Sequence, residues 1–195
     1  MYLFFYTLQY YPITIINIHK EKFLILKKLF NIIAFQICWW ICVIFSSTEL
    51  SYIGPLVMIL YLFCHYLFIT KDLNEFKFII LVGLIGTFFD SLFIVFDIFN
   101  YSSSFALITF IVPTWITAMW VGFATTINHS LKWINNNYYL AFIMGFIFGP
   151  LSYLTGEKFD AIQFNTSISL SLTILAFSWG FIMLFILILN KKIVK

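Results

Sequence analysis

Long apolar stretches alternate with short polar joints along most of the chain. Each stretch has about 17 to 23 residues, which at about 1.5 Å per helical residue matches the hydrocarbon core of a bilayer. A segment that spans lipid must satisfy its own backbone hydrogen bonds, and a helix does so. The pattern therefore predicts an all-α membrane bundle of six transmembrane helices, at residues 29–45, 53–69, 78–96, 105–127, 138–154 and 168–189.

The lysine residues indicate how this bundle is oriented. All 11 basic residues are lysine, and 10 of them lie before the first stretch, in the second and fourth joints, or after the sixth stretch. The remaining one, Lys158, shares the opposite side with Glu49, Asp97 and Asp160. Because cytoplasmic loops carry the excess of positive charge, both termini are expected in the cytoplasm.

Composition limits what else the chain can contain. Hydrophobic residues make up 63% and charged residues 10%, too few charges to cover the surface of a soluble domain. We therefore expect one membrane domain at residues 29–189 and a basic cytoplasmic tail at 190–195. The net charge of +3 suits anionic headgroups of membrane lipids and gives no indication of nucleic acid.

Residues 1–28 form an N-terminal extension with two open interpretations. The segment is apolar and rich in tyrosine, but it has no charged n-region and no small-residue cleavage site, and Pro12 interrupts it. It is either an interfacial segment or the product of a start codon assigned too early.

Asp90 is the first candidate for chemistry. Small and polar residues recur every three or four positions from Gly83 to Asp90, so they share one helix face. Asp90 lies near the middle of the predicted third span, where an ionisable group is costly and is often functional. The alternative is a structural clasp that bonds Thr114 or Thr117 of the next helix.

A second candidate lies at the cytoplasmic end of the fourth stretch. His129 and Asn128 are expected to form a catalytic acid–base pair, since histidine exchanges protons near neutral pH. The same residues could instead cap a helix and anchor it at the interface. The expected substrate-binding residues are Thr125, Ser130, Trp133, Gln36, His65 and Thr114, with Gln36 and His65 lining a pocket shared with Asn128 and His129.

The run at residues 123–133, together with residues 148–153, resembles the signature of a bacterial membrane family known as domain of unknown function 2878. Further matching pieces are Asn31, Gln36, Trp39 and the Asp90-Ser91 pair, and the similarity covers about residues 27–192. The resemblance implies a multi-pass protein of the bacterial inner (plasma) membrane. It carries no known activity and implies a bias toward lipid-related roles.

No cofactor or metal is expected from the sequence. Cys38 and Cys42 share a helix face and His65 lies in the next stretch, but no closely spaced ligand pair of the usual zinc type is present. Packing is the favoured role of these residues.

Three classes of function remain open. A lipid-related membrane enzyme or accessory protein would have a cleft that opens laterally to lipid. A small-solute or proton-coupled carrier would have a water cavity at the midplane, near Asp90, with broken helices. A non-catalytic interaction subunit would have a solid core and would hold a membrane partner protein. The first class is preferred, with membrane lipids as partners, and whether the protein is an enzyme is left open.

Overall fold

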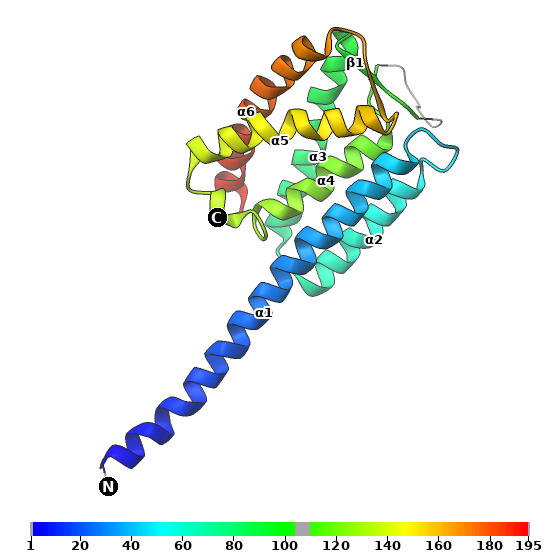
Figure 1. Cartoon of the computed structure of the whole chain (residues 1–195). Coiled ribbons are helices and arrows are strands. Elements are labelled where there is room, and N and C mark those ends of the chain that lie inside the picture. Colours follow the sequence, from blue (N-terminus) through cyan, green and yellow to red (C-terminus); the bar gives the residue numbers. More distant parts are fainter. Residues whose placement is uncertain (1, 104–109, 195) are drawn as a thin grey trace.

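The protein is a bundle of helices with one very long N-terminal helix (Figure 1). The computed structural model describes residues 2–103 and 110–194, and side chains from residue 20 onward. This part contains six α-helices: α1 (Tyr2–Phe45), α2 (Ile53–Phe68), α3 (Leu73–Val95), α4 (Thr114–Ile127), α5 (Tyr138–Lys158) and α6 (Ile168–Ile193). It also contains a short 3-10 helix, η1 (Lys132–Ile134), and two strands, β1 (Phe99–Tyr101) and β2 (Ile162–Phe164).

Polar residues fix the starts of three helices. The side chains of Asp72, Asn137 and Ser167 accept hydrogen bonds from backbone N–H groups in the first turns of α3, α5 and α6. Such caps satisfy donors that the helix itself leaves free. The starts of α5 and α6 agree with the starts predicted from the apolar pattern.

Four of the described helical segments are long and apolar enough to cross a membrane: 20–45 in α1, α3, α5 and α6. Helix α2 has 16 residues and α4 has 14, so they are about 21 to 24 Å long, less than a hydrocarbon core of about 30 Å. The helical bundle is thus confirmed, with four candidate membrane spans, whereas six full spans and the orientation of the termini stay predictions.

The predicted fourth span was wrong at its start. It began within residues 104–109, which lie outside the described residues, and Phe110 to Pro113 are not helical. Helix α4 begins at Thr114, directly after Pro113. A proline disfavours helical geometry at the residue before it, so an apolar stretch alone overestimates the helix here.

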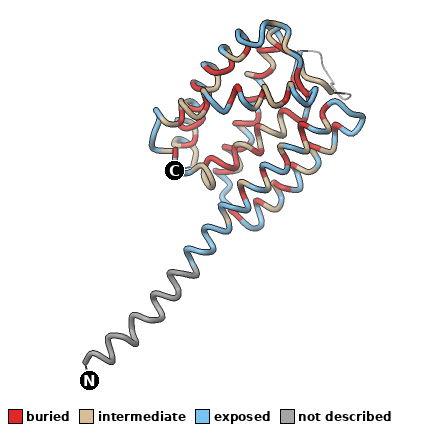
Figure 2. Tube along the Cα trace, viewed as in Figure 1, coloured by how far each residue is buried: buried red, intermediate tan, exposed pale blue. Residues whose placement is uncertain are grey.

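The helices pack as two groups joined through α3 and α4. Helix α4 contacts α1, α2 and α3, while α5 pairs with α6, and α6 contacts α3. Buried residues lie on the facing sides of the helices and the outer sides are exposed (Figure 2). Glycines permit the close contacts: a Cβ atom at Gly86 would overlap the Trp120 ring of α4, and one at Gly149 would overlap Trp179 of α6.

Strands β1 and β2 pair antiparallel at the end of the bundle where α3 and α5 finish. Phe99 lies opposite Phe164 and is fully buried, so the pair closes this end of the core. The apolar pattern did not predict these strands. The loops between α2 and α3 and between α4 and α5, which carry Lys71 and Lys132, lie at the other end of the bundle. Helix α6 also ends there with Lys191 and Lys192, and we call this end lysine-rich.

Helix α1 continues without a break from Tyr2 to Phe45, so the N-terminal extension and the first predicted span belong to one helix. Whether residues 1–28 are interfacial stays a prediction.

Candidate functional site

His65, Glu75 and His129 form a cluster at the lysine-rich end of the bundle. His65 lies in the last turn of α2, Glu75 in the first turn of α3, and His129 directly after α4. Both histidines turn to the same carboxylate oxygen: Glu75 Oε1 lies 2.6 Å from His129 Nε2 and 3.4 Å from His65 Nε2. The two imidazole rings are 5.1 Å apart between centroids, at 75° to each other.

The cluster is buried except on the side of His129. The side chains of His65 and Glu75 are 0% and 5% exposed, whereas that of His129 is 20% exposed. Within the described chain, Glu75 makes ion pairs with these two histidines and with no lysine. The Nδ1 atom of His65 is buried and has no hydrogen-bond partner. The cluster is therefore a carboxylate and two imidazoles with one opening to the outside.

A polar network centred on Asn31 lies beside the cluster. The amide of Asn31, which is fully buried in α1, donates to the Tyr61 hydroxyl at 2.9 Å and to the Thr125 carbonyl at 3.2 Å. Its side-chain oxygen accepts from the Ser130 hydroxyl at 2.7 Å. Since Ser130 follows His129, the network ties the loop that carries His129 to α1 and α2.

Asn128 belongs to a different contact. Its side chain and that of Asn190 in α6 exchange two hydrogen bonds, of 2.9 Å and 2.7 Å. The structure thus places His129 against α2 and α3, and Asn128 against α6. The predicted pair does not face one pocket, although the contact of His129 with a polar group of another helix was expected.

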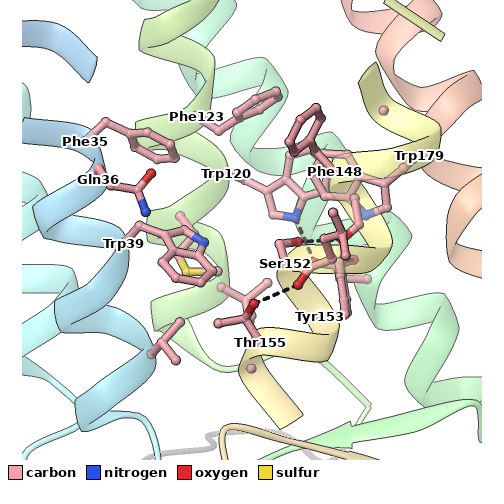
Figure 3. Close-up of a pocket in the computed structure, with 18 of the residues that line it drawn as sticks. Phe35, Gln36, Trp39, Trp120, Phe123, Phe148, Ser152, Tyr153, Thr155 and Trp179 are labelled. Carbon is pink, nitrogen blue, oxygen red and sulfur yellow. Dashed lines mark hydrogen bonds between the residues drawn. The ribbon is translucent and has the colours of Figure 1, made fainter. Parts of the chain in front are cut away.

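An aromatic cleft of about 480 Å³ lies between α1 and α5, with α4 and α6 behind it (Figure 3). Gln36 and Trp39 of α1 face Phe148 and Ser152 of α5 across it. Most of its lining is apolar, and the aromatic residues are Phe35, Trp39, Trp40, Trp115, Trp120, Phe123, Phe148, Tyr153 and Trp179. Trp40, Phe148 and Leu151 are also exposed to the outside, so the cleft opens through the apolar surface of the bundle.

Asp90 lies at the base of this cleft and is 2% exposed. Trp120 Nε1 donates to its Oδ2 at 2.8 Å, and the Tyr153 hydroxyl donates to its Oδ1 at 2.5 Å. The indole of Trp120 also stacks on Trp179, with ring centroids 4.6 Å apart. Asp90 therefore connects α3 with α4 and α5.

The prediction that Asp90 bonds Thr114 or Thr117 as a clasp was wrong. Thr117 instead bonds Thr87 at 2.8 Å, and Thr114 is exposed. The Trp120 ring lies over Gly86, so its N–H reaches along α3 to the carboxylate of Asp90.

The other predicted site residues are dispersed. Thr125 and Ser130 join the Asn31 network, Gln36 lines the aromatic cleft, and Trp133 is 60% exposed on the surface. Only His65 shares a cluster with His129, and the catalytic and binding roles stay predictions.

Glu75 was missed as a site residue. An acidic residue in the first turn of a helix has an ordinary explanation, because it complements the helix dipole. The only signal was its position shortly after His65, at the start of the next helix.

Comparison with known proteins gives one match. The family described as "Protein of unknown function (DUF2878)" matches residues 28–185, which include His65, Glu75, His129 and every residue that lines the aromatic cleft. No curated protein and no solved structure matches the chain.

Proposed function

The chain belongs to the DUF2878 family of proteins of unknown function, and we propose that it is a lipid-related membrane protein that holds an acyl chain in its aromatic cleft. The observation that carries this proposal is the cleft itself: an apolar space of about 480 Å³ whose rim is part of the exposed apolar surface.

The size and lining of the cleft suit such a ligand. Pockets for small ligands commonly enclose about 300 to 1,000 Å³ and are mostly apolar, with a few polar groups that fix orientation. Here the polar groups are few, among them Gln36, Asp90, Ser152 and Thr155. An acyl chain is apolar along its length, so it fits aromatic walls better than a polar solute does.

The position of the mouth favours a ligand that arrives from the bilayer. The rim residues Phe148 and Leu151 are 56% and 48% exposed on α5, one of the four helices that are long enough to cross a membrane. Exposed apolar side chains at this depth face lipid rather than water. A lipid tail could enter between α1 and α5 without crossing a polar surface.

The surroundings of Asp90 fit a solute or proton carrier less well than they fit a lipid-binding protein. Both of its carboxylate oxygens accept hydrogen bonds from side chains, and the residue is almost fully buried. Helix α5 contains Pro150 yet runs unbroken from Tyr138 to Lys158. A carrier commonly binds its ion or solute with broken helices around the site.

A lipid carrying a photoactivatable group on its acyl chain tests the proposal. The full chain is reconstituted in vesicles of phosphatidylcholine with a small fraction of this probe, irradiated, digested and analysed by mass spectrometry. The expected crosslinks lie on cleft residues such as Trp39 and Phe148.

A cleft-filling variant and a matched control make the result specific. Ser152 lines the cleft, and Ser152→Phe should reduce the cleft crosslinks because the new ring occupies the space of the acyl chain. Thr173→Phe places the same ring on an exposed position of α6 and should leave the cleft crosslinks unchanged. Equal labelling in wild type and Ser152→Phe would contradict the proposal.

A further inference from the structure

We propose that His65, Glu75 and His129 bind a divalent transition metal ion. One ligand atom from each of the three residues lies within 4.8 Å of the other two. The three come from α2, α3 and the segment after α4, so only the folded bundle brings them together. This inference is independent of the lipid proposal, since none of the three residues lines the aromatic cleft.

The donor set is one that transition metals prefer. Two imidazoles and one carboxylate bind catalytic zinc in several enzyme classes and non-haem iron(II) in others. Both sets use three protein ligands and leave a position open for water or a substrate. The 20% exposure of the His129 side chain provides such an opening here.

The present contacts need little change to accept an ion. The separations of 2.6 Å and 3.4 Å between imidazole Nε2 atoms and Glu75 Oε1 are hydrogen-bond distances. A metal bound at about 2.0 to 2.2 Å from each donor would replace the proton between His129 and Glu75 and move these two donors apart, whereas His65 and Glu75 are already far enough apart. His129 lies on a loop segment outside α4 and can supply this adjustment.

Charge and burial give a second reason. A buried carboxylate is costly unless a positive charge or several donors accompany it. When both histidines are neutral, no charged side chain pairs with Glu75 in the described chain, and Lys27 donates instead to the backbone carbonyl of Ile69. A divalent ion with two neutral histidines would compensate the charge of Glu75.

The burial of His65 points the same way. This imidazole is 0% exposed, and the contact of its Nε2 with Glu75 is long at 3.4 Å. A buried polar group with so little hydrogen bonding calls for an explanation, such as an ion. A metal bond at Nε2 would give His65 the strong contact that it lacks. The sequence did not predict this site, because its residues have no closely spaced ligand pair.

Cobalt(II) binding to the full chain is the first test. The protein is purified in detergent, stripped with a chelator and titrated with Co²⁺, whose visible d–d absorption reports a site of low coordination number. We expect bands that saturate at one ion per chain and disappear when Zn²⁺ is added. A wild-type protein that shows no such bands refutes the site, whatever the variants do.

The cysteine residues offer a competing explanation that the same spectrum excludes or supports. Thiolate ligands add an intense charge-transfer band in the near ultraviolet. Its appearance would place the metal on a cysteine, which is Cys38, Cys42 or Cys64, and would overturn the assignment to His65, Glu75 and His129.

Variants then locate the ion. Loss of one of three protein ligands should weaken Zn²⁺ binding by about 100-fold, as much as or more than loss of an outer-shell partner. Glu75→Gln and His129→Ala should therefore lose affinity in competition with a chromophoric chelator. The control Glu49→Gln changes an exposed carboxylate at the opposite end of the bundle and should keep full affinity. Equal affinity in all four proteins would show that the ion binds elsewhere.

Discussion

The imidazole Nε2 of His129 lies 2.6 Å from the Glu75 carboxylate, and this contact joins the end of α4 to the start of α3. His65 of α2 contacts the same oxygen from farther away. Three helices are thus connected through one buried acid at the lysine-rich end of the bundle, and the contact between His129 and Glu75 should contribute to stability.

His129→Ala should therefore destabilise the protein. A hydrogen bond to a charged group contributes about 1.5 to 3 kcal/mol, and the variant leaves Glu75 with only the longer contact to His65. The free energy of unfolding in detergent, measured with added chelator, is the readout. Trp133→Ala removes an exposed ring nearby and should change stability by less than about 0.5 kcal/mol. A loss no larger than in this control would show that the contact is energetically unimportant.

Substitutions at Asp90 should separate a structural clasp from a reactive group. Asp90→Leu leaves the Trp120 N–H and the Tyr153 hydroxyl buried without an acceptor, at a cost of about 1 to 3 kcal/mol for each donor. Asp90→Asn keeps one acceptor oxygen and the size of the side chain, so its loss should be smaller. Thermal unfolding in detergent and abundance in the membrane measure the loss of stability in both variants.

The effect of Asp90→Asn on activity is a separate test from its effect on stability. Once an activity is available, a clasp predicts that Asp90→Asn stays active. An inactive Asp90→Asn protein of normal abundance would instead support proton or cation handling by this carboxylate.

The pair formed by Asn128 and Asn190 should couple α4 to α6. Single substitutions to alanine each remove two hydrogen bonds and leave the partner amide, either the buried Asn190 or the half-buried Asn128, without them, whereas the double variant removes both amides. A double-mutant cycle on the free energy of unfolding should therefore give a coupling of about 1 to 2 kcal/mol. Additive effects would show that water replaces each amide without cost.

The orientation of the bundle can be tested with reporter fusions. Fusions after Lys71, Lys132 and Lys195 should report the cytoplasm, because the loops that carry excess lysine stay on that side. Fusions near Glu49, Ser103 and Asp160 should report the other side. The fusions next to α2 and α4 matter most, since these helices are shorter than the hydrocarbon core. One inverted joint would exclude the six-span topology.

The sequence determined the helical character of the protein and most helix ends. The apolar stretches predicted one helix end at Phe45 and three helix starts, at Ile53, Tyr138 and Ile168. The structure has all four. Hydrophobic length and polar caps are local properties, so they can be predicted from the sequence. The start of α4 could not be predicted in this way, since Pro113 limits the helix within a stretch that is still apolar.

Tertiary structure decided which polar residues meet. Asn128 and His129 are adjacent, but they lie in the turn that follows α4, where one side chain points to α6 and the other to α3. Likewise Asn31 and Gln36 differ by about 140° on α1, which places the first in the polar network and the second in the aromatic cleft.

The His65, Glu75 and His129 cluster depends on the order and register of three packed helices. Residue spacing along the chain carries no information about that packing, because contacts between distant segments are set by the side chains that fit between the helices. The sequence alone therefore determined a helical membrane protein with two candidate histidines, and only the folded bundle placed a buried glutamate between them.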